Sequence, residues 1–472
     1  MKKLTINIPL ISCFAFAVFL SGCLLKPDFK RPTVLGTEPY RDSQIAAESI
    51  ANLAWWELFD DERLQLLIVT ALKENRDRKA ALARIEQARA ILGVVAPDQL
   101  PRLDISAGAS RRGISSNSLP NLPGFSPRND FNLLGMLSFE LDIWGRYASA
   151  TEAERANLLA SEKMYKAVTL SLVSQVATTY LRILDFDRQV LIAERTLTSR
   201  HANTELIGQR FAKGYTAKID LNQAQIQEQE AASTLQTLQR RRRFAENALS
   251  LLVGSVPDEI FRSAPNTNPL AQTVIPSGVP AELLSRRPDV RGAEELARAA
   301  VMQIGVARAT QFPSLNLFGV IGLNSRQSTE LFTANGQTWS VGGNLVGPLV
   351  DLGKSWSRTD AAEAVAKEAL TNYESAVLTA VREVEDAVIS VETYHQEYEA
   401  RKAQVIAAKS ANMLSQKRYE SGVSSYLEVL NAQTSLFNAE LRESATQQQY
   451  LSAIVQLYKA LGGGWSSSKD IT

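Results

Sequence analysis

The sequence has very few of the residues that build metal, redox or thiol-based active sites. Its 472 residues include only two cysteines and two histidines, His201 and His395, which is too few for a His/Cys metal cluster. It also lacks an excess of either charge, since 51 Lys and Arg oppose 50 Asp and Glu for a net charge of +1. Nucleic acid is therefore not an expected partner, because no basic field extends over the protein.

Recognisable catalytic motifs are absent as well. No Gly-x-Ser-x-Gly motif, His-Glu-x-x-His motif or closely spaced cysteine pair occurs. The segment Gly347–Ser355 resembles a phosphate-binding loop, but five residues instead of four separate its two glycines. Its counterpart in the first half of the chain, Leu141–Arg146, indicates a strand-to-helix junction instead. We therefore expect no enzyme activity, no catalytic residue, no metal site and no cofactor.

The N-terminal segment up to Cys23 follows the pattern of a bacterial lipoprotein signal. Two lysines precede an apolar run over residues 4–20, and Leu20-Ser21-Gly22-Cys23 resembles a lipobox. We expect removal of residues 1–22, followed by attachment of diacylglycerol to the Cys23 sulfur and of an N-palmitoyl chain to its amine. An uncleaved membrane anchor is the alternative. Leu24, where inner-membrane lipoproteins have aspartate, favours the outer membrane.

Glycine and proline are missing from four long stretches of the chain. Residues 146–213 contain one glycine, Gly208, and no proline, and the other three stretches contain neither. Globular sequences are normally interrupted by these residues far more often, so the stretches predict helices rich in Ala, Gln, Glu and Leu. Apolar residues recur at a spacing of three to four, which indicates coiled-coil-like packing. The predicted helices span residues 146–213, 215–253, 354–421 and 423–461.

The chain is also an internal repeat. The sequence Arg210-Phe211-x-x-Gly214 returns at a numbering offset of 208 as Arg418-Tyr419-x-x-Gly422. Self-similarity of this extent predicts a duplicated architecture, with repeats over about residues 60–254 and 275–462 of the mature chain 23–472. Upstream of the strands the numbering offset is 212 instead, and it relates Asp77 to Asp289, Gly93 to Gly305, and Pro101 to Pro313.

Four segments between the predicted helices have an alternating pattern. Residues 131–143 place apolar side chains on one parity and Asn, Ser, Glu and Asp on the other, and residues 103–110 alternate similarly. About ten to thirteen residues of period two match a tilted outer-membrane strand, and two soluble hairpins are the alternative. Four strands cannot close a barrel, so membrane strands would require oligomerisation. The predicted strands lie near residues 101–111, 131–143, 313–324 and 337–350.

Several motifs resemble those of TolC-like outer membrane factors. They include Trp55-Trp56-x-x-Phe59-x-Asp61-x-x-Leu64 and Arg286-Arg287-Pro288-Asp289-Val290, and Pro27-x-Phe29-x-Arg31-Pro32 is similar to the lipoprotein branch that serves resistance-nodulation-division pumps. The resemblance implies an α+β membrane protein and a homotrimer in the outer membrane, in which twelve strands, four per chain, form one β-barrel. An α-helical barrel would continue into the periplasm, where a periplasmic adaptor and an inner-membrane resistance-nodulation-division transporter complete the conduit.

The resemblance also implies roles for the turns between the long helices. It places them at the periplasmic end, where the adaptor docks, so Arg210, Gly214, Arg418 and Gly422 are candidate docking residues. Both glycines are expected to adopt φ > 0 and to reverse the helices tightly. That turn-forming role alone is the alternative.

The positions just after the second turn narrow the pore in this family. Acidic residues there are implied to face the pore, and this chain has Glu428 followed by the neutral Asn431. Three copies of Glu428 would form one ring of negative charge, which favours cations. Alternatively, Ser425-x-x-Glu428 matches a capping box, in which Glu428 only stabilises the start of a helix.

The expected function is that of a passive outer-membrane duct of a tripartite efflux pump for small molecules such as drugs. Type I protein secretion and metal export are the alternatives among channels, although only five methionines occur, without the clusters that suit copper or silver. A structural coiled-coil lipoprotein without a pore is the alternative from a different class. A channel predicts heat-sensitive trimers and ion conductance in planar bilayers, whereas a structural lipoprotein predicts neither.

Overall fold

The computed structural model describes residues 27–32, 61–113, 127–262 and 287–463. Cys23 lies outside these residues, as do Trp55, Trp56 and Phe59. The chain forms two compact units. The first contains Ile85–Ser161, Gly292–Tyr373 and the short segment before residue 33, and the second contains the remaining described residues.

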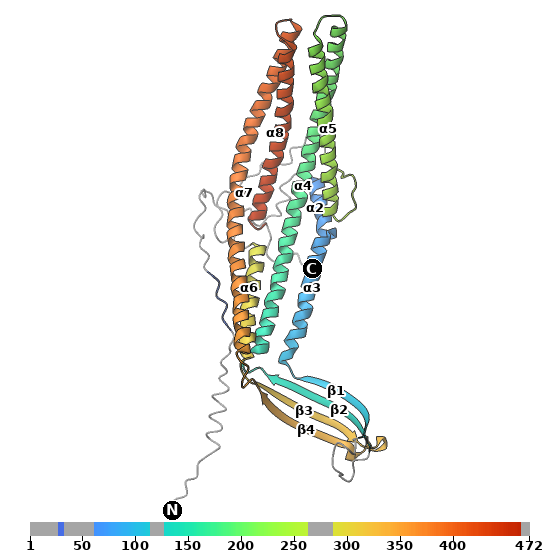
Figure 1. The fold of residues 1–472 in the computed structure, drawn as a ribbon, viewed down its shortest axis with the longest axis vertical. Helices are drawn as coiled ribbons and strands as arrows, with labels where there is room; N and C mark the ends of the chain where they lie inside the picture. Colours follow the sequence, from blue (N-terminus) through green and yellow to red (C-terminus); the bar gives the residue numbers. More distant parts are fainter. Residues whose placement is uncertain (1–26, 33–60, 114–126, 263–286, 464–472) are drawn as a thin grey trace, which may run out of the picture. The chain divides into compact units, whose positions relative to one another are not determined.

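One antiparallel sheet of four strands belongs to the first unit. The strands β1 (Arg102–Arg112), β2 (Arg128–Leu141), β3 (Ser314–Ser325) and β4 (Gln337–Val346) lie side by side in that order (Figure 1). Because each strand pairs with its neighbour in sequence, β1 and β4 form the two edges of the sheet. Neither outer edge has a strand partner within the described residues.

The strand ends differ from the expected ones by a few residues. β4 stops at Val346, four residues before the expected end, because Gly347 and Pro348 follow and proline has no N–H for a strand ladder. β2 runs from Arg128 to Leu141 instead of 131–143, and the chain turns at Gly145, where φ is +73°.

Long helices make up most of the described chain. Helices α4 (Arg146–Ala212) and α7 (Lys354–Glu420) have 67 residues each, and α5 (Lys218–Leu252) and α8 (Tyr426–Ala460) have 35 each. Each of the two longest helices rises roughly 100 Å at about 1.5 Å per residue. The helices form two hairpins, α4–α5 and α7–α8 (Figure 1). α5 and α8 begin three residues later than expected, so both turns are longer than the glycine positions suggested.

Shorter helices flank these hairpins. They are α2 (Glu62–Glu74), α3 (Arg76–Val95) and α6 (Pro288–Ala309), with 3₁₀ turns η2 (Ala96–Gln99), η4 (Ser328–Glu330) and η5 (Ala334–Gly336). Among the described helices, α4 is the one with a stretch long and apolar enough to cross a membrane, but 56% of that stretch is buried in the protein. We therefore assign it to the protein core.

The core of the second unit forms where α2 packs on the long helices. Leu64 of α2 is buried beside Tyr180 of α4 and Leu457 of α8. The Tyr180 hydroxyl donates a hydrogen bond of 2.8 Å to Oδ2 of Asp61. The other carboxylate oxygen of Asp61 accepts from the N–H groups of Arg63 and Leu64, and thereby caps α2. Asp61 and Leu64 thus both hold α2 against α4, which explains why they occur together in the Trp55–Leu64 motif.

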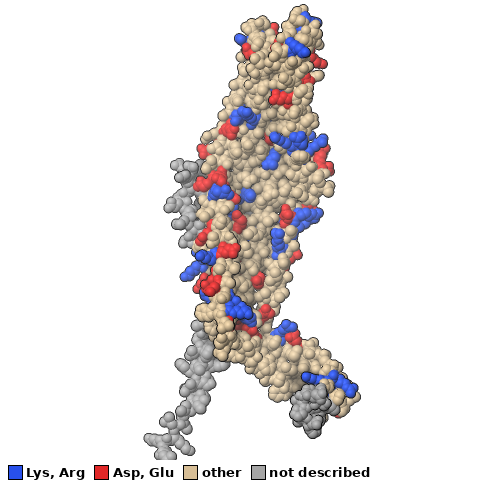
Figure 2. Space-filling view, in the orientation of Figure 1, with Lys and Arg blue, Asp and Glu red and all other residues tan. Residues whose placement is uncertain are grey.

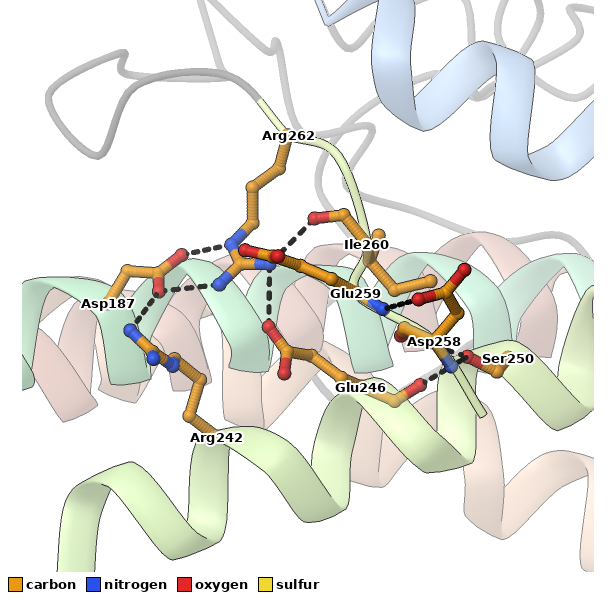
Figure 3. A network of polar contacts seen from close by, with 8 residues as sticks. All are labelled: Asp187, Arg242, Glu246, Ser250, Asp258, Glu259, Ile260 and Arg262. Carbon is orange, nitrogen blue, oxygen red and sulfur yellow. Dashed lines mark hydrogen bonds and ion pairs between the residues drawn. The ribbon is translucent and has the colours of Figure 1, made fainter. Parts of the chain in front are cut away.

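A buried polar network fixes the segment that follows α5 (Figure 3). The Arg262 guanidinium donates two hydrogen bonds to the Asp187 carboxylate on α4, with an Nη2–Oδ1 distance of 2.9 Å, and lies 2.7 Å from Oε1 of Glu246 on α5. Arg242 lies 3.5 Å from the same Asp187 carboxylate. Burial lowers the pKa of Arg262, but the two carboxylates outweigh burial, so that the pKa is raised. The end of the first repeat is thereby held against its own helical hairpin.

Equivalent contacts recur in the two repeats. The side-chain amide of Gln99 donates to the Thr151 hydroxyl at 2.6 Å, and Gln311 donates to Thr359 at 2.7 Å. Carbonyl groups at the ends of α5 and α8 also accept equivalent side-chain hydrogen bonds. The Asn75 amide donates to the Leu252 carbonyl (2.9 Å), and the Arg287 guanidinium donates to the Ala460 carbonyl (3.1 Å). The same two numbering offsets relate the members of each pair of contacts, so the duplication extends from sequence to individual hydrogen bonds.

Candidate functional site: the helix turns and the sheet

The two helix turns have the same backbone conformation. Gly214 and Gly422 have φ of +76° and +75°, and no atom lies within 4 Å of the position where either would carry a Cβ. In the first turn the N–H of residue 215 donates to the carbonyl of Arg210 at 2.9 Å, and in the second the N–H of residue 423 donates to the carbonyl of Arg418 at 2.9 Å. This is the pattern in which glycine ends a helix, so backbone conformation alone accounts for both glycines.

Arg210 connects the first hairpin to the second. Its Nη1 donates a hydrogen bond of 2.9 Å to the hydroxyl of Tyr419, and its guanidinium lies 5.3 Å from the centre of the Tyr419 ring. The Tyr419 ring is 5.4 Å from that of Tyr426. Tyr426 also belongs to a cluster of buried side chains from both hairpins, which consists of Ile207, Ala224, Tyr426, Val429 and Leu430.

Tyr426 is the buried polar group of this cluster. Its side chain is 5% exposed, and its hydroxyl has no hydrogen-bond partner among the described residues. Burial, with a smaller contribution from Tyr419 and Asp220, raises the pKa of Tyr426 to about 12. Neither tyrosine was among the candidate residues that the sequence indicated. The available signal was the change from Phe211 in the first repeat to Tyr419 in the second, which adds a hydroxyl at the position that Arg210 contacts.

Glu428 lies opposite Arg418 across the second turn. Nε of Arg418 donates to Oε1 of Glu428 at 3.1 Å, and the two side chains are 54% and 44% exposed. The capping-box alternative is wrong for this turn, because the Ser425 side chain makes no capping hydrogen bond. Asn431 lies one helical turn further along α8 and is exposed. An exposed pair of this kind contributes only about 0.2–1 kcal/mol to stability, so it can open at small cost.

Apolar side chains predominate on one face of the sheet, whereas the other face is more polar but includes Met136, Phe318 and Val346. Odd-numbered residues pair with odd-numbered residues in all three ladders, for example Leu103 with Leu137 and Leu315 with Leu345. Apolar side chains of this parity are 67–81% exposed at Leu103, Ile105, Ile321, Trp339, Val341 and Leu345. The part of the surface formed by the strands carries few charges in Figure 2, whereas acidic and basic side chains intermingle over the helices. An exposed apolar face backed by a polar face is typical of a membrane-spanning β-barrel.

This architecture matches a known family over most of the chain. The sequence pattern of the outer membrane efflux protein family matches residues 67–255 and 279–463, one segment in each repeat. The chain belongs to the outer membrane efflux protein family. Its relatives include outer membrane protein OprJ of Pseudomonas aeruginosa (33% identical, over 98% of this chain and 97% of the relative). Two others are solvent efflux pump outer membrane protein SrpC of Pseudomonas putida (33%, 96% and 98%) and cation efflux system protein CusC of Escherichia coli O6:H1 (32%, 96% and 98%).

Solved structures show the same fold. The CmeC outer membrane channel of Campylobacter jejuni superposes with a TM-score of 0.89 at 28% identity, over 95% of this chain and 96% of that chain. The open-state MtrE outer membrane channel of Neisseria gonorrhoeae gives 0.84 at 29% identity, over 94% and 98%. The expected fold class is therefore confirmed: a trimeric channel with four strands per chain and long helices.

Family membership also confirms the expected class of function and location. The protein is an outer-membrane channel of a tripartite efflux pump that extends into the periplasm. The family is one of transport proteins and not an enzyme family.

Proposed function

We propose that this channel passively conducts small organic molecules, such as drugs and solvents, to the cell exterior. The observation that carries a duct through the membrane is the two-sided sheet, in which exposed apolar side chains would contact lipid and the opposite, more polar face would line the barrel. Relatives named for solvent and toluene efflux, both 33% identical over 96% of this chain, support an organic substrate. The transporter and not the duct would then select the substrate.

Metal cations are the second candidate cargo. CusC, a cation efflux protein, is 32% identical over 96% of this chain, and Glu428 would present a carboxylate to cations at a constriction when its exposed pair with Arg418 opens. The two candidates separate in a strain that lacks the gene. We expect lower tolerance of toluene and lipophilic drugs with unchanged tolerance of copper and silver, and recovery when the gene is restored. Sensitivity to the metals alone would favour cation export.

The helix turns are the proposed docking site for a periplasmic adaptor that links the channel to a resistance-nodulation-division transporter. Arg210, Gly214, Arg418 and Gly422 bound the two turns, whose outer residues Lys213 and Ser421 are exposed. Open space at the Cβ positions of both glycines is compatible with close approach of another protein. Glutamate at Lys213 and Ser421 should reduce adaptor co-purification, while glutamate at the exposed Lys402 of α7 should not. Equal recovery of adaptor from both would contradict docking at the turns.

A lipid anchor on Cys23 is the last part of the proposal. The pattern Leu20-Ser21-Gly22-Cys23 supports diacylglycerol on the sulfur and palmitate on the amine. Labelled palmitate should be incorporated into the wild type and not into Cys23→Ala. The barrel should keep some of the variant in the outer membrane, since acyl chains and an inserted barrel contribute separately to membrane binding. Equal labelling of both proteins would contradict lipidation at this cysteine.

A further inference from the structure

Helices α4, α7 and α8 line a groove of about 560 Å³ in the second unit. α8 lies between the other two helices (Figure 1) and contributes the buried Ala453 to the lining. Tyr394 of α7 also lines the groove and is half-buried. Small-molecule sites in proteins usually have volumes of about 300–1,000 Å³. The groove is therefore large enough for a drug-sized molecule.

The groove lies on the face of α4 that is turned away from α2. Tyr180 of α4 donates to Asp61 at the start of α2, whereas Thr178 and Arg182 line the groove. Residues two positions apart in an α-helix point in nearly opposite directions, because each residue turns the helix by about 100°. Inside a duct, α2 would obstruct the passage of cargo. The face that carries the groove would therefore line the interior of the channel.

Two opposite charges in the groove have no ion-pair partner among the described residues. They are Arg182 of α4 and Asp386 of α7, and both are exposed. At the repeat offset of 208, Arg182 corresponds to Ser390. Asp386 corresponds in the same way to Thr178, and both neutral counterparts also line the groove. Charges that the helices themselves required would be expected in both repeats, so the unmatched charges indicate a ligand.

Arg182 lies at one end of the groove. Ser444 of α8 donates a hydrogen bond of 2.6 Å to Asp185 of α4, and the two helices run antiparallel (Figure 1). Arg182 comes three residues before Asp185 and is therefore level with about residue 447 of α8. The part of α8 that lines the groove begins at Gln448. The guanidinium thus belongs to the end of the groove that is nearer to the helix turns.

Asp386 lies towards the other end of the groove. Arg287 donates to the Ala460 carbonyl (3.1 Å) and to the Glu383 carboxylate (2.6 Å), which places the ends of the groove on α7 and α8 at one level. Asp386 is then level with about residue 457 of α8, roughly 15 Å from the arginine end at about 1.5 Å per residue. Glu383 is already paired with Arg287, whereas Lys459 has no ion pair within the part of the chain that the structure describes. This end therefore holds one free charge of each sign.

We propose that the groove binds elongated organic zwitterions on their way through the channel, with a carboxylate at Arg182, an ammonium group at Asp386 and an aromatic body against Tyr394. The separation of the two charges, which the side chains themselves partly span, suits a molecule that is charged at opposite ends. Because the ammonium group has to compete with Lys459, the carboxylate end contributes more to binding. Weak binding suits a duct, since cargo must enter the site and leave it again. The transport role rests on the proposed function, whereas the binding itself does not.

Binding of norfloxacin to purified trimers tests the site, because this fluorescent zwitterion has its carboxylate and its ammonium group at opposite ends of an aromatic ring system. Fluorescence anisotropy should show saturable binding in dilute salt. Arg182→Gln should weaken binding about three- to fivefold and Asp386→Asn about twofold, as expected for partly exposed ion pairs. Lys459→Gln should strengthen binding, because the ammonium group loses its competitor. The controls Arg243→Gln and Glu392→Gln remove exposed charges outside the groove and should leave binding unchanged.

Two modified probes assign the ends of the ligand. N-acetylnorfloxacin has no ammonium group, so its affinity should depend on Arg182 and not on Asp386, and norfloxacin ethyl ester, which has no carboxylate, should show the reverse. Absence of saturable norfloxacin binding would overturn the proposal, as would equal sensitivity of both modified probes to both substitutions. Weaker norfloxacin binding in both Arg182→Gln and Lys459→Gln would show a general preference for anions, and this result would also overturn it.

Tolerance assays separate the groove from the proposed function. In a strain that lacks the gene, the Arg182→Gln channel should restore tolerance of the uncharged toluene as fully as the wild type does, but tolerance of norfloxacin only in part. Full restoration of both by the variant would overturn a role of the groove in transport. A wild-type gene that restores neither would instead contradict the proposed function, while binding to purified trimers would still decide the existence of the site.

Discussion

Neutralising either member of the Arg418–Glu428 pair should shift the ion selectivity of the channel in opposite directions. In the wild type the guanidinium lies 3.1 Å from the carboxylate, so each chain contributes no net charge from this pair. The ring of three negative charges expected from the sequence is therefore largely compensated. Glu428→Gln leaves three uncompensated positive charges in the trimer, and Arg418→Gln leaves three negative ones.

The size of the effect follows from Coulomb's law. An ion about 10 Å from each of three like charges interacts with them by about 1.2 kcal/mol in water, which changes its local concentration roughly eightfold. The Debye length is about 10 Å at 0.1 M salt and about 30 Å at 0.01 M, so the shift should be largest in dilute salt. The pair itself contributes only about 0.2–1 kcal/mol per chain, and trimers should remain intact in both variants.

Reversal potentials of purified trimers in planar bilayers under a KCl gradient measure this shift. Arg418→Gln should be more cation-selective than the wild type and more strongly blocked by multivalent cations, and Glu428→Gln should be less so. Glu399→Gln is the matched control, because it breaks an exposed pair with Lys402 (3.1 Å) on the same helix, far from the turn. Shifts of equal sign in the two test variants, or no shift in the most dilute salt, would refute a pore-facing pair.

Three further predictions concern the second unit. Arg262→Met should lower its stability by roughly 3 kcal/mol, because it leaves the buried Glu246 carboxylate without a guanidinium and Asp187 with the more distant Arg242 alone. Denaturation should show partial recovery when Glu246→Gln is added. Tyr426→Phe should be neutral or stabilising in the same assay, since the buried hydroxyl of Tyr426 has no partner among the described residues. A loss of stability above about 1 kcal/mol would show that the hydroxyl does have a hydrogen-bond partner. Burial raises the pKa of Asp185, so the folded state binds its proton more tightly than the unfolded state does. Wild-type stability should therefore fall as pH rises from the unfolded pKa through the folded one. Asp185→Asn should lack this fall, and parallel pH profiles of the two proteins would contradict the prediction.

Much of the fold could be predicted because its signals are local and repeated. The absence of proline, and the near absence of glycine, over residues 146–213 and 354–421 predicted helices that the structure has at Arg146–Ala212 and Lys354–Glu420. Strand ends were less accurate, because alternation continues into residues 347–350 while Pro348 interrupts the ladder. The start of α8 was misplaced for a similar reason: the sequence contains no breaker between Val423 and Ser425, and the turn geometry decides where helical bonds begin.

The contacts at the turns could not be predicted, because they depend on which of several polar groups each arginine meets in three dimensions. Arg210 and Arg418 occupy equivalent places in the repeats, and so do Asp220 and Glu428. Arg418 pairs with Glu428 within its own hairpin, whereas Arg210 reaches across to the hydroxyl of Tyr419.

The Arg210–Tyr419 hydrogen bond therefore connects the first turn to the second. The exposed Arg418–Glu428 ion pair lies within the second hairpin. Asp220, left without the arginine that its counterpart has, accepts a hydrogen bond from the Thr216 hydroxyl instead. Sequence symmetry alone would give both turns the same contact. The repeats also differ here by one added hydroxyl, at Tyr419 in place of Phe211, and this hydroxyl is the one that Arg210 contacts. Tyr419→Phe should accordingly release Arg210, and a second substitution, Arg210→Gln, should then have little further effect on trimer stability or conductance. Additive effects of the two changes would show that Arg210 acts through another partner.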